Sequence, residues 1–486
     1  MRSQKKPPGS GKQKAAAGAN KQKRRSRRKG MTLDDRPLLE PNAAGIDIGA
    51  REIYVAVPAD RDEDPVRVFL TFTADLEEMA RWLLSCRITT VAMESTGVYW
   101  IPLYDVLERH GIRPCLVNAR NMKNVPGRRT DWHECQWIQF LHSVGLLRAA
   151  FRPDGNVGAV RSLVRHRTDL VQMAAQHIQH MQKSMTQMNL QIHHVLSEIT
   201  GVTGLAIVDA ILAGERDPAE LAKLRDYRVQ ASEEVVRKSL VGNWEPQHLF
   251  TLRQSRQIFQ SYQELITACD EEIEKLVIAF EPRVDPAERP LPADRKEKQR
   301  KQKVKGVIPG NNPKTGFDMR TEVYKLFGVD VTQIPGLMMT ALPLFSETGR
   351  DMSRWKTADH FASWAGLCPD NDITGGKVAW SGMRSRRNRT GQLFCMAAFG
   401  LHHELSPMGD YLRRKKANMG PAGAQIATAH KLAVIFYTMV KNQVEYDASI
   451  WAKRDAERDK RIEARLRRQA GQKGYKLVRI EENTAA

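Results

Sequence analysis

Cysteine is scarce in this sequence, and the cysteines that occur lie far apart. The 486-residue chain has six: Cys86, Cys115, Cys135, Cys269, Cys368 and Cys395. None forms a Cys-x-x-Cys pair, so a zinc site built on paired cysteines is not expected. Widely spaced free thiols are typical of a cytoplasmic chain.

Long apolar runs are also missing. The sequence has no apolar run of about 18 residues, the length that would predict a membrane span. The N-terminus is basic, but no apolar stretch follows the charges, so a secretory signal is not expected. Hydrophobic residues still make up 41% of the chain, which is enough for folded cores.

Acidic residues are absent from segment 1–30, which contains twelve lysines and arginines of a chain whose net charge is +20. A segment of like charges is expected to be disordered. It can bind phosphates by counterion release without recognising sequence. The alternative is a tail that only increases solubility. A pI of about 9.7 agrees with a polyanionic partner but does not identify it.

Composition and periodicity divide the chain into six parts. These are a basic disordered tail (1–40), an α/β domain with a mixed sheet (41–155), a helical coiled-coil arm (156–281), a basic proline-rich linker (282–320), a mainly α-helical domain (321–450) and a charged C-terminal tail (451–486).

In the α/β part, strands precede an alternation of strands and helices, which predicts a mixed sheet. Strands are expected at 44–49, 53–57, 66–72, 89–94 and 113–117, and helices at 73–85, 100–110 and 131–144. Thr73 is expected to cap the first of these helices.

Glycine and proline are absent from 160–196, where apolar residues recur every three or four positions. This predicts one long amphipathic helix. A second long helix is expected at 247–280, with shorter helices between, which together indicate an antiparallel coiled-coil arm. The adjacent His193 and His194 are expected on the first long helix and, facing different ways, are not expected to bind metal.

Prolines and the basic run at 295–305 then predict a linker. Helical periodicity returns at 321 and extends to 450. One stretch within it, 369–389, is rich in Gly, Asn and Arg and is expected to be non-helical. Residues 453–486 are charged and mostly helical by pattern.

Four carboxylates in the α/β part are candidate metal ligands: Asp47, Glu94, Asp131 and Glu134. Asp47 lies inside an apolar strand and Glu94 at the end of another, where α/β sheets place ligand sites. Asp131 and Glu134 share a helix face. Hard oxygen ligands suit Mg²⁺ or Mn²⁺. Alternatively, Asp131 and Glu134 only cap a helix.

Several motifs around these acids resemble one known family. They are AGIDIG at 44–49, MESTGVYW at 93–100, VNAR at 117–120 and TDWHECQWI at 130–138. In order, spacing and flanking residues, they resemble the RuvC-like domain of the DEDD insertion-sequence transposases, the one-hundred-and-ten family and its eleven-eleven group.

The resemblance implies a ribonuclease-H-like core that holds Mg²⁺ or Mn²⁺ through Asp47, Glu94, Asp131 and Glu134. The family usually has aspartate at the position of Glu134, and the longer side chain could move the ion. This part then corresponds to the family's RuvC-like metal-binding domain.

Further along, IPGL at 334–337, SRW at 353–355, FASWAGL at 361–367 and TGGK at 374–377 resemble the same family's C-terminal transposase domain. There a serine before Gly-Gly attacks the DNA phosphate and forms a covalent link. Here that residue is Thr374, whose hydroxyl is also nucleophilic but more crowded. Three interpretations stay open: Thr374 is the nucleophile, the chain is impaired, or Ser381 serves instead.

Five cations lie downstream of Thr374: Lys377, Arg384, Arg386, Arg387 and Arg389. They are candidate nucleic-acid contacts that stabilise charge or position the backbone; a solvated face is the alternative. The segment 334–337 resembles a helix–hairpin–helix turn, which can bind phosphate, or it is an ordinary turn between helices.

The resemblance also implies partners. Transposases of this kind act on DNA, are guided by a structured RNA of the element and work as homo-oligomers, here a dimer or a tetramer, with no membrane association. A bacterial cytoplasmic, nucleoid-associated location follows. Two other functions stay open: a metal-dependent nuclease resembling a junction resolvase, which would not need Thr374, and a catalytically inactive nucleic-acid-binding protein.

Overall fold

The computed structural model describes residues 37–95, 97–118, 130–153, 155–293, 318–383 and 387–478. The chain forms two compact units, residues 1–151 and 152–486. No helix within the described ranges is long and apolar enough to cross a lipid bilayer. The basic segments 1–30 and 295–305 lie outside these ranges.

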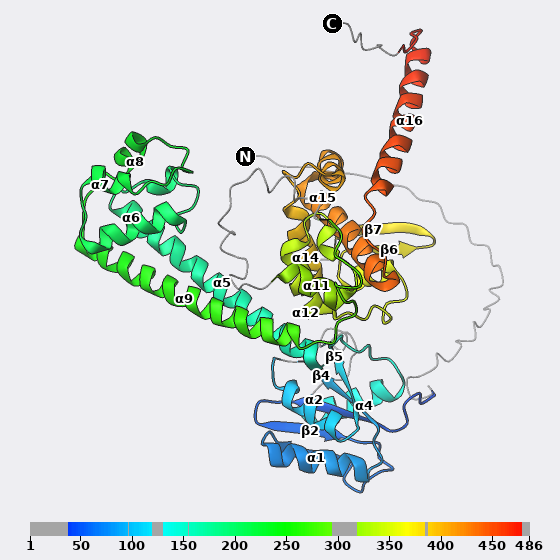
Figure 1. Ribbon diagram of the computed structural model, residues 1–486. Coiled ribbons are helices and arrows are strands. Elements are labelled where there is room, and N and C mark those ends of the chain that lie inside the picture. The colour runs from blue at the N-terminus through cyan, green and yellow to red at the C-terminus, as the bar shows by residue number, and fades with distance from the viewer. Residues whose placement is uncertain are drawn as a thin grey trace, which may run out of the picture. The chain divides into compact units, whose positions relative to one another are not determined.

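The first unit is built on a five-stranded sheet (Figure 1). Its strands are β1 (Ala43–Ile48), β2 (Glu52–Ala56), β3 (Val66–Leu70), β4 (Thr90–Glu94) and β5 (Arg113–Val117). Their order is β3-β2-β1-β4-β5. The first three strands pair antiparallel, whereas β1, β4 and β5 pair parallel. The predicted mixed sheet is confirmed.

Within the described part of this unit, the sheet is covered by α1 (Thr73–Ser85), α2 (Trp100–Arg109) and α4 (Asp131–Ser143). Helices α1 and α2 share the main core with Ile46 and Met93. Helix α4 packs on the residues that alternate with these, such as Ala92, through Ile138. The sheet is therefore the middle layer. The predicted cap at Thr73 is wrong, because Thr73 is the first helical residue and Phe72 precedes it without a side-chain cap bond.

A buried histidine links α4 to the start of β4. His142 is 7% exposed, and its Nε2 lies 3.0 Å from the hydroxyl of Thr90. Burial holds the pKa of His142 below its ordinary value. The folded state therefore keeps this ring neutral in a range where the unfolded chain already binds a proton.

We expect the thermal midpoint of the first unit to be constant above about pH 7 and to fall below about pH 6.5. The lowered folded-state pKa means that, under these acidic conditions, the unfolded chain binds more protons. Melting curves between pH 5 and 8 measure this, and His142→Gln should flatten the dependence. The control is His194→Gln, because His194 is exposed, and it should keep the wild-type pH dependence. If the thermal midpoint of His142→Gln fell with acid as much as that of the wild type, the prediction would be contradicted.

Two 33-residue helices, α5 (Gly155–Gln187) and α9 (Pro246–Ile278), pack along each other in the second unit (Figure 1). Arg167 pairs with Asp270, and the Ser184 hydroxyl lies 3.0 Å from that of Thr251. Ascending positions on α5 thus meet descending positions on α9, so the pair is antiparallel. We call this pair and the segment joining it the arm.

The segment joining the two long helices contains α6 (Val202–Ala213), α7 (Pro218–Lys223) and α8 (Glu233–Ser239), as predicted in kind. The predicted extent of the first helix is wrong at its end. Helix α5 stops at Gln187 because Asn189 adopts a left-handed conformation, with φ of 57°. His193 and His194 lie on a separate 3₁₀ turn, η2 (Ile192–His194), rather than on the long helix.

The rest of the second unit is mainly helical. It contains α11 (Met319–Phe327), η3 (Val331–Gln333), η4 (Met338–Thr340), α12 (Ala341–Thr348), α13 (Ala358–Trp364), α14 (Arg389–Phe399), α15 (Pro407–Asn442) and α16 (Ser449–Gln472). Edge-to-face and stacked rings form its core: Phe327, Phe345, Phe361, Phe394 and Phe436. Helix α15 is interrupted at Gly420, just before Pro421.

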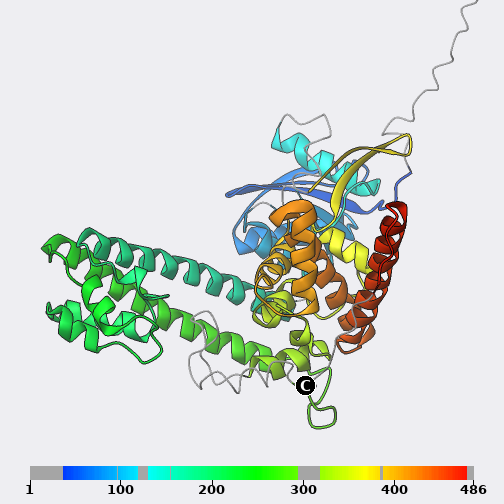
Figure 2. The same cartoon turned by 90° about the horizontal axis from the view of Figure 1, so that it is seen from above.

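The predicted non-helical stretch is a two-stranded hairpin of β6 (Pro369–Thr374) and β7 (Lys377–Met383). Figure 2 shows this hairpin projecting from the helices of the second unit as a ribbon. Its apolar side chains Ile373, Val378 and Trp380 are more than half exposed. An isolated two-stranded hairpin buries little core of its own and is at best marginally stable in water.

Candidate active site

Gly45 allows helix α4 to lie directly on strand β1. A Cβ at this position would lie 2.2 Å from the backbone nitrogen of Gln139 and 2.3 Å from the carbonyl oxygen of Cys135. The side-chain amide of Gln139 also donates a 3.2 Å hydrogen bond to the carbonyl oxygen of Ala43. Gln139 thus lies beside the start of β1, and Cys135 lies farther along it.

The same alignment brings the first turn of α4 to the end of β1. From Cys135 back to Asp131, the helix advances about 6 Å. From Gly45 to Asp47, the strand advances about 7 Å. Because the two elements run in opposite directions, Asp131 lies at about the level of Asp47.

Asp47 and Glu94 occupy equivalent positions on neighbouring parallel strands. Ile46 pairs with Met93, so each acid is the next residue along its strand. Ile46 and Met93 face the main core, and side chains alternate along a strand. Both carboxylates therefore belong to the face that α4 covers, where they are half-buried.

Two nearby groups respond to both aspartates. Tyr54 is the cross-strand partner of Asp47, and its pKa is raised, chiefly by its hydrogen bond to Glu52 and also by Asp131 and Asp47. Burial raises the pKa of Cys135 to about 12, with Asp47 and Asp131 adding to the effect. Sequence reasoning did not single out Tyr54, although the register of the first hairpin could have indicated it.

The cap of α4 does not require the candidate ligands. Thr130 is the N-cap, and its hydroxyl accepts a hydrogen bond from the backbone N–H of His133. The ring of His133 lies 2.6 Å from the same hydroxyl. Asp131 and Glu134 lie in the first turn, inside the helix. Helix capping therefore does not account for these two acids.

The four predicted metal ligands are not gathered into one cluster of side chains. In the described part of the chain, no three His, Cys, Asp or Glu side chains are grouped so that they could hold a metal ion. The fold brings Asp47, Glu94 and Asp131 to about the same height along the sheet. Glu134 lies about one turn after Asp131 on helix α4. All four are oxygen donors of the kind that Mg²⁺ and Mn²⁺ prefer.

Thr374 lies at the tip of the β6–β7 hairpin. It pairs with Lys377 across a two-residue turn. Gly375 and Gly376 both have positive φ, 58° and 77°, as a tight turn between strands of natural twist requires. The Thr374 side chain is exposed, so its hydroxyl is accessible to a large substrate.

Ser381, the alternative nucleophile, is placed differently. It lies on β7 opposite Asn371, and its hydroxyl donates a 2.7 Å hydrogen bond to the side-chain oxygen of Asn371. This contact holds the Ser381 hydroxyl across the hairpin, away from the turn that carries Thr374.

The candidate cations do not form one set. Lys377 is exposed beside Thr374. Arg387 is half-buried, and its Nε has no hydrogen-bond partner among the described residues. Arg389 begins α14, with its Nε 3.8 Å from the carboxylate of Glu347. Arg384 and Arg386 lie outside the described residues.

The segment 334–337 forms a tight turn between η3 and η4. Gly336 has φ of 84°, and a Cβ there would lie 2.6 Å from the carbonyl oxygen of Ala397 on α14. The glycine is thus explained by its close approach to α14. That explanation fits an ordinary turn between helices as well as a phosphate-binding one.

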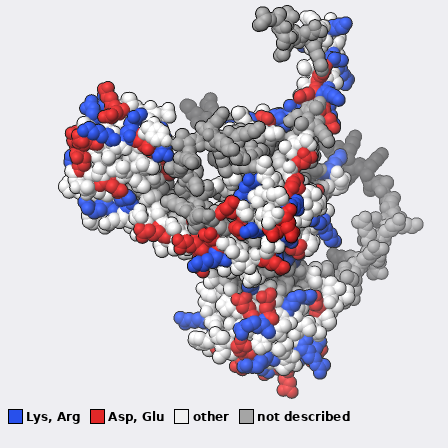
Figure 3. Space-filling model, viewed as in Figure 1, with Lys and Arg blue, Asp and Glu red and all other residues white. Residues whose placement is uncertain are grey.

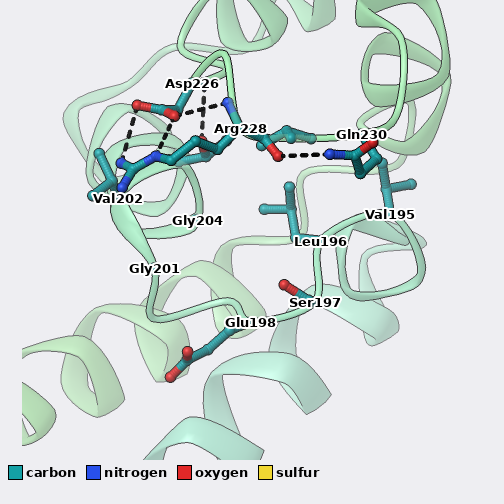
Figure 4. A pocket seen from close by; sticks show the side chains of 12 residues that line it. Val195, Leu196, Ser197, Glu198, Gly201, Val202, Gly204, Asp226, Arg228 and Gln230 are labelled. Carbon is teal, nitrogen blue, oxygen red and sulfur yellow. Dashed lines mark hydrogen bonds and ion pairs between the residues drawn. The ribbon is translucent and has the colours of Figure 1, made fainter. Parts of the chain in front are cut away.

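A pocket of about 460 Å³ lies at the far end of the arm (Figure 4). In it, the guanidinium of Arg228 donates two hydrogen bonds to Asp226, so its charge is balanced. None of the sequence-predicted site residues lines this pocket. On the visible face, basic and acidic side chains are interspersed over the arm (Figure 3).

Two parts of the chain match known families. Residues 44–190 match a transposase model of the DEDD type. Residues 330–410 match the model described as "Transposase IS116/IS110/IS902 family". No curated protein matches the chain. The first match contains all four acids, and the second contains Thr374, so the chain belongs to the IS110 family of transposases and is a DNA transposase.

Proposed function

We propose that this transposase cuts and rejoins DNA through a covalent protein–DNA intermediate formed by Thr374, with a divalent metal ion held by Asp47, Glu94, Asp131 and Glu134. One observation carries the nucleophile: Thr374 is exposed at the tip of a projecting hairpin, beside Lys377. A hydroxyl that must reach a phosphate within a duplex needs such access.

The strand order supports a ribonuclease-H-like fold for the first unit. Antiparallel β1–β3 followed by parallel β4 and β5 places Asp47 on the central strand and Glu94 on its neighbour. When bound, Mg²⁺ or Mn²⁺ supplies charge stabilisation at a phosphodiester under attack. The protein's own part is to hold the carboxylates through the Gly45–α4 contact.

The exchange of bonds is balanced. The oxygen of Thr374 forms a bond to phosphorus as one bridging oxygen of the DNA leaves and takes a proton. Attack by a DNA hydroxyl on the same phosphorus then restores the Thr374 hydroxyl and joins the strands. In this proposal Lys377, the cross-strand partner of Thr374, stabilises negative charge on the phosphate.

The proposed partners are DNA and a structured guide RNA, and the proposed active unit is a homo-oligomer in which one protomer supplies Thr374 to the metal site of another. An RNA that pairs with DNA would carry the sequence recognition. The arm is proposed as a coiled coil that contacts nucleic-acid backbones. Helix α9 carries exposed acids, among them Glu264, Glu271 and Glu272, which would repel phosphates. We therefore expect nucleic acid to contact other faces of the arm.

The test is to incubate the protein with Mg²⁺, the element's RNA and its DNA, and then to denature the mixture. A DNA-linked peptide that contains Thr374, identified by mass spectrometry, supports the proposal. A DNA-linked peptide that carries the link at Ser381 would assign the nucleophile to Ser381 instead. Cleavage without an adduct would indicate a nuclease, and binding alone would indicate an inactive relative. Chelation of the metal before the reaction should prevent formation of the adduct. Chelation after the reaction should leave the adduct intact.

A further inference from the structure

One buried acid in the second unit has three arginines around it. Glu347, in the last turn of α12, is 4% exposed. Its carboxylate accepts hydrogen bonds of 2.8 and 2.9 Å from Arg165 and lies 3.0 Å from Nη2 of Arg161. Arg389 approaches the same carboxylate at 3.8 Å. Arg161 and Arg165 lie one turn apart on α5, whereas Arg389 begins α14.

The charges in this cluster do not balance. Arg165 binds Glu347 through two hydrogen bonds, so this one pair is already neutral. Arg161 and Arg389 leave a local charge of about +2, and like charges at this range repel. Burial, together with the nearby Arg165 and Arg389, lowers the pKa of Arg161, against the opposing effect of Glu347.

Donor groups also remain unused. The Nε of Arg161 is buried and has no hydrogen-bond partner among the described residues. The contact of Arg389 with Glu347 is longer than a hydrogen bond. A guanidinium carries five N–H donors, so the cluster has more donors than Glu347 can satisfy.

Solvent can reach the arginines but hardly reaches the acid. The side chains of Arg161, Arg165 and Arg389 are 23%, 40% and 34% exposed. An anion that approaches from solvent therefore meets guanidinium groups before it meets the carboxylate. Arginine is also the side chain that best matches the geometry of phosphate oxygens.

We propose that Arg161, Arg165 and Arg389 form a binding site for a backbone phosphate of duplex DNA. A purely structural link between α5 and α12 would need only Arg165. DNA is favoured because α14, which begins at Arg389, is the next helix in the sequence after the hairpin that carries Thr374. The proposal rests on the proposed function only for this choice of DNA.

The first test measures how duplex-DNA binding depends on salt. Arg389→Gln should lower the slope of log affinity against log salt by about 0.9, the value for one lost phosphate contact, and should weaken binding several-fold at about 0.1 M salt. Its melting temperature should stay unchanged, because its contact with Glu347 is longer than a hydrogen bond. The matched control is Arg67→Gln on β3, outside the arm, an arginine of similar exposure, with a 43% exposed side chain.

A double variant gives a second measurement. If Arg161 and Arg389 bind the same phosphate, Arg161→Gln in the Arg389→Gln background should change the slope much less than it does alone. Two full and independent decreases would overturn the shared site. Circular dichroism confirms that each variant is folded.

Other outcomes would also overturn the proposal. A lower melting temperature with an unchanged slope would make the cluster structural. A lower slope for a structured RNA but not for duplex DNA would assign the phosphate to RNA. The binding assay requires no catalysis, so a lowered slope without any adduct in the wild type would reject Thr374 chemistry and keep this site. An unchanged slope together with normal adduct formation would reject this site and keep the Thr374 chemistry.

Discussion

Thr374→Ala should reduce covalent protein–DNA adduct by roughly 10³-fold or more, because the substitution removes the attacking oxygen. The side chain is exposed at the hairpin tip, so the fold should be unaffected and DNA binding should stay near the wild-type value. Thr374→Ser should form the adduct several-fold faster than the wild type, since serine lacks the methyl group that restricts rotation about χ1. Denaturing gels with labelled DNA measure both effects.

Ser381→Ala is the matched control. It removes a hydroxyl from the same hairpin, together with the hydrogen bond to Asn371, and should leave most of the adduct. If adduct persisted in Thr374→Ala and disappeared in Ser381→Ala, the assignment of the nucleophile would be reversed.

Gly45→Ala should destabilise the first unit by about 3 kcal/mol, the upper end of the usual cost of overpacking. The added Cβ would meet backbone atoms of Gln139 and Cys135 at 2.2 and 2.3 Å. Backbone cannot move aside as a flexible side chain can, so α4 must shift. The melting midpoint should fall by roughly 10 °C.

The same shift would move Asp131 relative to Asp47, so adduct formation should fall even below the melting temperature. Gly158→Ala is the control, because nothing lies within 4 Å of its added Cβ. Within helix α5 it should be neutral or stabilising by up to about 1 kcal/mol. A Gly45→Ala protein as stable as the wild type would mean that α4 does not need this contact.

Much of the fold followed from periodicity. The strands around Asp47 and Glu94 alternate or run apolar as buried strands do, and helix 73–85 has the predicted bounds. The end of α5 was missed because the apolar spacing continues past Asn189, whose left-handed conformation ends the helix. The backbone conformation of one residue is not encoded in that pattern.

The candidate site was only partly within reach of the sequence. Motif order identified the four acids and Thr374, but not the close approach of α4 at Gly45, which depends on tertiary packing. Arg389 was a candidate nucleic-acid contact because it lies downstream of Thr374 in the sequence. Arg389 lies beside Glu347, together with Arg161 and Arg165 of α5, and Arg165 precedes Glu347 by 182 residues. Spacing along the chain could not indicate this arrangement.

The length of the antiparallel pair of α5 and α9 sets the length of duplex that the pair could cover. Each helix has 33 residues, which at about 1.5 Å per residue gives a rod of roughly 50 Å. Duplex DNA rises about 3.4 Å per base pair, so a duplex lying along this rod would be covered over roughly 15 base pairs. Lengthening both helices by seven residues, two turns each, should extend a nuclease-protection footprint by about 3 base pairs if the rod lies along the duplex.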